Sequence, residues 1–329
     1  MTPWSAFSPP TRSDARAFRH AIIPAAGNAV KPVMVLGMHR SGTSLIAQAL
    51  AAGGCYAGEP GDLLAAGRDN PLGFVEHREL VAANDTLLEA RGASWFRPPA
   101  ASDMPALQPD IDQENVQADV PCALRERLAQ GSSGKSILIK DPRLCLTWPL
   151  WLSAWPDAVV VYVYRNPLAV ARSLQLRNRF PATLGLALWE VYNRSALMSL
   201  EGRNHVCISY DRVRANPDEL TALLQALHDL GVQCDAASAI GVFNAGISQV
   251  GHDSFALDAS LQTYEQTLLD AHCQGLCHGE RLSPLPSASP SLLPRLWDLV
   301  DAFAPLAEHI QTENARRDAE QLCEERTAE

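Results

Sequence analysis

The chain alternates short apolar runs with segments whose apolar residues recur at helical spacing. Continuous β-branched and aromatic runs are typical of strands buried on both faces of a parallel sheet. We predict strands at residues 33–36, 136–139, 158–164 and 205–210, and helices at 43–50, 78–92, 167–173, 186–200 and 217–230. This alternation predicts an α/β fold with three layers, a parallel sheet flanked by helices, in which ligands bind at the carboxyl ends of the strands.

Turn residues and prolines divide the chain into parts. Residues 53–80 are rich in Gly, Pro and Asn, which indicates long loops over an active-site face. A polar, proline-bearing insertion follows between Pro98 and Pro121. We predict a loosely held extension at 1–30, one catalytic domain at 31–280 that ends in a helical extension from 236, and a linker with a C-terminal helix and tail at 281–329. The apolar stripe between Leu296 and Ile310 is expected to pack on the core.

The first predicted strand runs directly into a glycine-bounded loop, Gly37 to Ser44. A buried strand, a tight loop and a helix N-terminus together form an anion cradle, because free backbone N–H groups and the helix dipole point at the bound group. Gly37 and Gly42 have the spacing of an NTPase P-loop, but Thr43 stands where that motif needs lysine. The positive charge lies inside the loop instead, at Arg40.

Two further strand ends carry cations. The run at 136–139 ends in Lys140, and the run at 158–164 ends in Arg165, which is followed by Asn166-Pro167 and, after two helical turns, by Ser173. Proline suits the first turn of a helix, where its missing N–H costs nothing. A guanidinium fork and a hydroxyl suit a dianionic phosphate. Since parallel strands end at one edge, we expect one cleft to collect these side chains with Arg40.

These motifs resemble those of bacterial sulfotransferases that use 3′-phosphoadenosine 5′-phosphosulfate (PAPS). The loop Arg40-Ser41-Gly42-Thr43-Ser44 matches the family pattern [KR]-[ST]-G-[ST]-[ST] at every position, and the resemblance spans residues 31–235. It implies a P-loop-like sulfotransferase architecture with PAPS as co-substrate. It further implies that the loop binds the 5′-phosphate, that Arg165 and Ser173 bind the 3′-phosphate, and that Arg40 and Lys140 stabilise the leaving group. A Tyr-Asp pair such as Tyr210-Asp211 also occurs in the family, although it fits an edge-of-core tyrosine and a helix-capping aspartate equally well.

The position of the general base differs from that in the cytosolic members of the family. Those members carry a histidine two residues after the strand-end lysine, whereas this chain has Pro142 there. Residues 70–77 resemble the N-P-x-G-[FY]-x-E-[HD] segment of bacterial members. The resemblance favours Glu76 as the base, then His77, then Glu59. Each also has a plain interpretation, the glutamates as solvated loop acids and His77 as a helix-start residue. A carboxylate base needs a dry pocket that raises its pKa.

Composition narrows the partners and the compartment. A net charge of −10 argues against a nucleic-acid partner. No apolar run reaches membrane-spanning length and the N-terminus lacks a signal pattern, so we expect a cytoplasmic protein. Eight scattered cysteines, several of them in apolar stretches, favour reduced core thiols. His272-Cys273 and Cys277-His278 lack the second pair that a zinc site needs, so no metal is assigned.

The acceptor and the oligomeric state stay open at this stage. A carbohydrate, a lipid and a small molecule with a hydroxyl group are all admissible acceptors. Two rival functions also remain: a nucleotide or small-molecule kinase, and a PAPS-binding module without catalysis. The kinase needs the lysine that Thr43 replaces and a strand-end aspartate for Mg²⁺.

Overall fold

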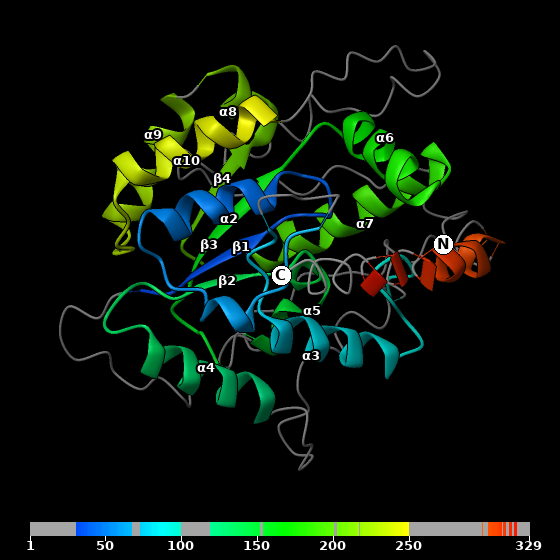
Figure 1. The fold of residues 1–329 in the computed structure, drawn as a ribbon, viewed down its shortest axis with the longest axis horizontal. Helices are drawn as coiled ribbons and strands as arrows, with labels where there is room; N and C mark the ends of the chain where they lie inside the picture. Colours follow the sequence, from blue (N-terminus) through cyan, green and yellow to red (C-terminus); the bar gives the residue numbers. More distant parts are fainter. Residues whose placement is uncertain are drawn as a thin grey trace, which may run out of the picture.

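A parallel four-stranded sheet forms the centre of the molecule (Figure 1). The computed structural model describes residues 31–67, 73–99, 119–151, 154–200, 203–216, 218–249, 298, 302–310, 312–313, 316–317 and 319–320. The strands are β1 (Val33–Leu36), β2 (Leu138–Lys140), β3 (Val159–Tyr164) and β4 (His205–Ser209), in the order β2-β1-β3-β4. Every strand pair is parallel, which confirms the predicted α/β fold.

Helices cover both faces of this sheet. One face carries α2 (Thr43–Ala52), α8 (Tyr210–Ala215), α9 (Asp218–Asp229) and α10 (Ala236–Gln249). The other carries α3 (Arg78–Glu89), α4 (Asp119–Gly131), α5 (Leu144–Trp151), α6 (Pro167–Asn178) and α7 (Ala182–Ser199). A short 3₁₀ helix, η3 (Pro60–Asp62), lies in the loop region after α2. Figure 1 shows α8, α9 and α10 above the sheet and α3, α4 and α5 below it.

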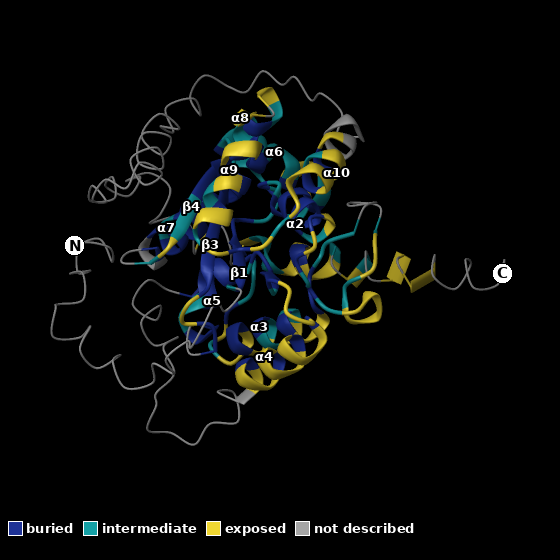
Figure 2. Cartoon of the chain, turned by 90° about the vertical axis from the view of Figure 1, so that its left-hand side faces the viewer, coloured by how far each residue is buried: buried dark blue, intermediate teal, exposed yellow. Residues whose placement is uncertain are grey.

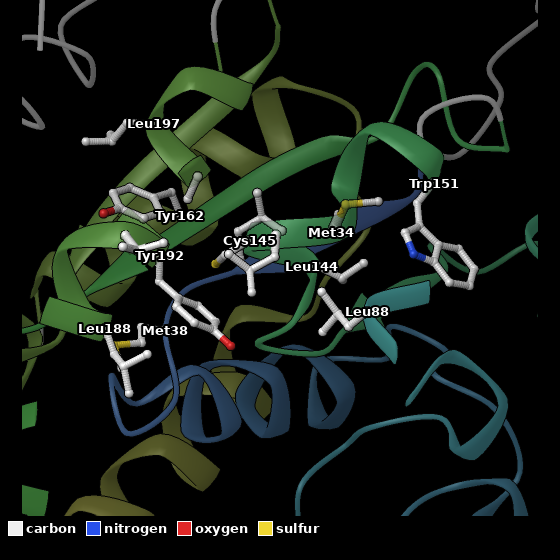
Figure 3. Close-up of a cluster of buried hydrophobic side chains, with 14 of the residues drawn as sticks. Met34, Met38, Leu88, Leu144, Cys145, Trp151, Tyr162, Leu188, Tyr192 and Leu197 are labelled. Atoms are coloured by element: carbon white, nitrogen blue, oxygen red, sulfur yellow. The ribbon is translucent and has the colours of Figure 1, made fainter. Parts of the chain in front are cut away.

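Alternating strand residues build two separate cores. Val33 and Val35 of β1 pack with the α2, α9 and α10 side, whereas Met34 and Leu36 pack with the α3, α5 and α7 side. This division follows from the strand geometry, in which successive side chains point to opposite faces. Figure 2 shows the strands as the buried centre, with exposed residues on the outer surfaces of α4 and α9. Figure 3 shows part of the second core, where Met34 and Tyr162 gather with side chains of α5 and α7.

Several element boundaries differ from the sequence prediction. Helix α7 begins at Ala182, directly after Pro181, rather than at 186. Tyr210 is the first residue of α8 instead of the last residue of β4, because the Ser209 hydroxyl caps that helix by accepting from Arg212 N–H. Helix α4, at the end of the predicted insertion, was not foreseen.

The C-terminal region is described only in part. Residues 302–310 are helical, and Phe303, Ala304 and Ala307 pack against the core, as expected for that portion of the apolar stripe. The predicted extension at 1–30, the linker at 281–290 and residues 250–280 lie outside the described residues.

The four strands end at one edge of the sheet, and this edge positions the candidate site. The parallel register pairs Val35 with Lys140, and Leu36 with Tyr162. Gly37, Asp141, Arg165 and Tyr210 therefore follow the strand ends side by side, although they come from segments up to 173 residues apart (210 − 37). Among the described residues, no helix is long and apolar enough to cross a membrane.

Candidate active site

Two glycines allow the loop between β1 and α2 to lie close to its neighbours. Gly37 has φ +157°, and a Cβ there would lie 2.4 Å from the Val163 carbonyl oxygen. Gly42 has φ +87°, and a Cβ there would lie 2.1 Å from Cδ2 of Tyr210. Gly42 is also the residue that caps α2, so the N–H groups of the first helical turn open directly onto the loop.

Arg40 joins the two phosphate-binding motifs predicted from the sequence. Its backbone is left-handed, with φ 68°, a conformation that is uncommon outside glycine and clusters at functional sites. Arg40 Nε donates a hydrogen bond to Ser173 Oγ at 2.7 Å. Arg165 Nη1 donates to the carbonyl oxygen of Arg40 at 3.1 Å. The loop, the strand-end arginine and the helix serine thus form one connected group.

Arg165 is held by groups from two helices, α8 and α7. Its guanidinium lies over the Tyr210 ring, 5.1 Å from the centroid, and its Nε lies 3.8 Å from Asp211 Oδ1. Trp189 Nε1 of α7 donates to the Arg165 carbonyl oxygen at 3.0 Å. Asp211 also accepts from the backbone N–H of Asn166 at 2.7 Å. The Tyr210-Asp211 pair therefore supports the arginine directly, which its ambiguous sequence signal did not establish.

Ser41 Oγ and Arg165 Nε of this group are buried and make no hydrogen bond with other described residues. A buried polar atom without a partner costs about 1–3 kcal/mol, so such atoms usually await a ligand or water. A hydroxyl and a guanidinium N–H beside a helix N-terminus are donors that suit phosphate oxygens.

Lys140 lies on the other side of the loop and is fully enclosed. Its ammonium donates to Ser44 Oγ at 2.9 Å, to the Phe74 carbonyl oxygen at 3.1 Å and to Glu76 Oε1 at 2.5 Å. The Lys140 and Glu76 side chains are 1% and 8% exposed. Burial raises the pKa of Glu76, against the opposing pull of the Lys140 charge. Val75, directly before this glutamate, has φ 52°, a strained conformation for a β-branched residue that turns Glu76 toward Lys140.

A second buried network follows Lys140. Asp141 accepts from Asn84 Nδ2 at 2.8 Å and from the backbone N–H of Arg143 at 2.9 Å. The guanidinium of Arg143 forms ion pairs with Asp141 at 3.1 Å and with Asp85 at 2.6 Å. Burial lowers the pKa of Arg143, but the two carboxylates outweigh it and raise the pKa above its ordinary value. These charges fix the turn that follows Lys140.

Of the three predicted bases, only Glu76 contacts the cationic group. Glu59 accepts from Tyr56 Oη at 3.0 Å and forms the capping box of η3 with Asp62. His77 caps α3, and its Nδ1 accepts from the Glu79 N–H at 3.3 Å. Neither Glu59 nor His77 bonds to Arg40, Lys140 or Arg165 among the described residues. These local contacts agree with the plain interpretations of both residues, as a loop acid and a helix-start residue.

One side chain of the loop was missed by sequence reasoning. His39 directly precedes Arg40, and its ring lies 4.6 Å from that of Trp95 and 5.8 Å from that of Tyr192 (centroid distances). Its Nε2 is buried and makes no hydrogen bond among the described residues. Burial, followed by the charges of Arg143, Arg177, Lys140 and Arg40, holds the pKa of His39 well below 6.5. The only sequence signal was its place inside the phosphate loop.

Metal ligands do not gather in the part of the chain that the structure describes, where no group of three or more His, Cys, Asp or Glu side chains is arranged to hold an ion. The His272-Cys273 and Cys277-His278 pairs lie outside the described residues. Of the described cysteines, Cys55, Cys145 and Cys207 are buried free thiols, Cys234 is half-buried and Cys122 is exposed.

The fold and the site define an α/β protein in which a glycine loop, a lysine and an arginine meet at the carboxyl edge of a parallel sheet. The model of the sulfotransferase family matches residues 32–233, which is more than half of the chain. The chain belongs to this family, whose chemistry is the transfer of sulfuryl groups.

Two solved structures are similar to the chain. The sulfotransferase STF9 from Mycobacterium avium shares 15% sequence identity with a TM-score of 0.43, and the match covers 84% of this chain and 77% of that protein. The sulfotransferase domain of the Synechococcus PCC 7002 olefin synthase shares 19% identity with a TM-score of 0.43, covering 85% of this chain and 97% of that domain. Among curated proteins, no sequence matches significantly.

Proposed function

We propose that the protein transfers a sulfuryl group from PAPS to the hydroxyl group of a carbohydrate, lipid or other small molecule. The observation that carries the proposal is the Arg40–Ser173 hydrogen bond, which joins the loop motif to the serine of the second motif across 133 residues of chain. PAPS carries a 5′-phosphosulfate and a 3′-phosphate. A ligand with two anionic ends suits two donor groups that are already in contact.

We assign the binding of the donor nucleotide to the connected group, which is the loop with Arg165 and Ser173. The backbone N–H groups and hydroxyls of Ser41, Gly42, Thr43 and Ser44 would hold the 5′-phosphate at the N-terminus of α2, where the helix dipole favours negative charge. Arg165 and Ser173 would hold the 3′-phosphate. Arg165 Nε and Ser41 Oγ support this assignment, since both are buried without a hydrogen bond among the described residues and a phosphate would accept from both.

Sulfuryl transfer resembles phosphoryl transfer, in which positioning and charge stabilisation supply most of the catalysis. As the bond between sulfur and the bridging oxygen breaks, negative charge develops on the 5′-phosphate of the leaving nucleotide. Lys140 lies beside the loop and Arg40 lies within it, and we assign to both the stabilisation of that negative charge. Glu76 holds the Lys140 ammonium beside Ser44 and thereby fixes its position in the loop.

The reaction is assigned to the cytoplasm, because the buried free thiols of Cys55, Cys145 and Cys207 suit a reducing compartment. The departure of Thr43 from the P-loop lysine supports a sulfotransferase over a kinase.

The decisive experiment compares two nucleotides on one variant. In Arg165→Ala, affinity for PAP (3′-phosphoadenosine 5′-phosphate) should fall roughly 10- to 100-fold, since a charge-assisted hydrogen bond is worth about 1.5–3 kcal/mol. Affinity for adenosine 5′-phosphosulfate, which has no 3′-phosphate, should change much less. Isothermal titration calorimetry measures both values.

Arg214→Ala is the matched control. Its guanidinium lies over the same Tyr210 ring, 5.8 Å from the centroid, but it belongs to α8 and not to the connected group. It should leave both affinities unchanged. Equal losses of both nucleotides in Arg165→Ala would make Arg165 a structural residue. Thermal protection of the native protein by ATP with Mg²⁺, and none by PAP, would replace the proposal with a kinase.

A further inference from the structure

We propose that His39 is the group that accepts the proton from the acceptor hydroxyl. The inference rests on the proposed function and assigns a step that the sequence motifs left to Glu76, His77 or Glu59. It starts from the position of His39, which lies in the phosphate loop directly before Arg40. Lys140 and Arg40, the two cations assigned to the leaving group, lie close enough to act on this imidazole through their charges.

The surroundings of His39 favour a neutral ring. Arg143 after β2, Arg177 on α6, Lys140 on β2 and Arg40 in its own loop all act on it with positive charge, which adds to the effect of burial. Tyr192 of α7 and Trp95 contribute only aromatic rings. Near neutral pH the ring is thus deprotonated. We assign its remaining proton to Nδ1, which leaves the lone pair on Nε2.

That lone pair is unused. Nε2 is buried and makes no hydrogen bond with the described residues, whereas the Glu76 carboxylate already accepts from Lys140 at 2.5 Å. Using Glu76 as the base would release the Lys140 ammonium at the moment when the leaving group needs it. Using His39 leaves the Lys140–Glu76 pair intact.

The step balances without a further reactant. The acceptor O–H bond breaks and its proton moves to His39 Nε2, while the acceptor oxygen forms a bond to sulfur. The bond between sulfur and the 5′-phosphate oxygen breaks, and PAP leaves with the electron pair. The sulfonate that PAPS brings beside the ring raises its proton affinity during transfer, and His39 later returns the proton to solvent.

Trp95 controls access to this nitrogen. Its partly exposed ring lies 4.6 Å from that of His39, and its carbonyl oxygen accepts from Tyr192 Oη at 2.6 Å. Nε2 is buried, so bulk water does not reach it, and we infer that an acceptor enters by displacing the adjacent Trp95 ring. This arrangement protects bound PAPS from hydrolysis, in which water takes the place of the acceptor.

Hydrolysis of ³⁵S-labelled PAPS tests the proposal without knowledge of the acceptor. Trp95→Leu should hydrolyse PAPS several-fold faster than the native protein, because water reaches His39. In Trp95→Leu with His39→Gln, the rate should fall roughly 10²- to 10⁴-fold, the usual contribution of a positioned base. A double variant as fast as Trp95→Leu would overturn the proposal, as would a Trp95→Leu variant with no increase.

His205→Gln in the Trp95→Leu background is the matched control. His205 also has a buried Nε2 without a hydrogen-bond partner among the described residues, but it lies at the amino end of β4, away from the loop. Its loss should leave the hydrolysis rate unchanged. PAP affinity, measured in parallel, should be retained in every variant.

A second readout does not depend on turnover. Nuclear magnetic resonance titration of the histidine side chains, with His39→Gln to assign the signal, should give His39 a pKa below 6.5 in the free protein. Addition of PAP should perturb that signal, because the loop holds both. A ring that is protonated at neutral pH with PAP bound would refute the base. A protein that binds no PAP would instead refute the proposed function, while the titration would still report on His39.

Discussion

The contact between Gly42 and the Tyr210 ring gives the sharpest prediction about the loop. In Gly42→Ala, the new Cβ would lie 2.1, 2.5 and 2.7 Å from three carbons of that ring. Carbon atoms pack at about 3.5–4.0 Å, so the buried ring must shift by roughly 1.5 Å. Overpacking of this kind costs about 1–3 kcal/mol, and alanine at a left-handed φ adds about 1–2 kcal/mol. We expect a total loss of about 2–5 kcal/mol in the free energy of unfolding.

Gly54→Ala separates the two contributions. Gly54 has φ +101°, but a Cβ there would have no atom within 4 Å. It therefore carries the backbone strain alone, and we expect a loss of about 1–2 kcal/mol. Urea unfolding measures both variants. Because Arg165 lies over the same ring, Gly42→Ala should also weaken PAP binding at least tenfold, whereas Gly54→Ala should not.

A double variant completes the test. Tyr210→Ala creates a cavity and is destabilising by itself, but it removes the ring that the Gly42→Ala methyl group strikes. The loss of stability in the double variant should therefore be smaller than the sum of the losses in the two single variants, with a coupling free energy of about 1–3 kcal/mol. Strictly additive losses, or equal losses in Gly42→Ala and Gly54→Ala, would refute the steric reasoning.

Three further predictions concern the buried polar groups. Asn84→Ala should lower the free energy of unfolding by about 1–3 kcal/mol, because Asp141 loses one of its donors and the buried Trp151 N–H loses its acceptor, whereas Thr86→Ala on the exposed face of the same helix should change it by less than about 0.5 kcal/mol in urea unfolding. Burial raises the pKa of Cys145 to about 12, so iodoacetamide at mild alkaline pH should alkylate exposed Cys122 at least tenfold faster in the native protein, as read by peptide mass spectrometry; comparable rates would contradict a closed core. The unfolded chain protonates His39 below about pH 6.5 while the folded protein does not, so native stability should fall as the pH drops below that value, by up to about 1.4 kcal/mol per pH unit relative to His39→Gln; parallel curves for the two proteins would refute the lowered pKa.

The fold was predictable because its signals are local. The β1 and β3 runs are apolar at every position, and Pro167 with Asn166 marks the start of α6, where the Asn166 side chain accepts from two backbone N–H groups. The start of α7 was placed too late because Pro181 and the small residues after it give little helical periodicity. Helix α4 was missed because prolines and polar residues before it indicated a loop.

The site was predictable where a motif names residue types, and not where tertiary contacts decide. Arg40, Lys140, Arg165 and Ser173 come together as the motifs implied. The difference between Glu76, Glu59 and His77 depends on which backbone turn faces Lys140, and the left-handed Val75 that sets this direction has no sequence signature. The environment of the His39 ring depends in the same way on tertiary contacts, because the rings around it come from distant segments.

The order of the strands has a consequence for how such a protein diverges. The two central strands, β1 and β3, end in the loop and the arginine that we assign to the nucleotide, while β2 lies at the edge of the sheet. The chain between α2 and β2 is about 85 residues long (53–137), follows the phosphate loop in sequence, and contributes Glu76 and Trp95 to the site. Insertions, deletions and exchanges in that connection change the residues that lie next to His39 without disturbing the β1–β3 pairing. Grafting the connection from one member of the family onto another is therefore a route to a new acceptor with an inherited donor.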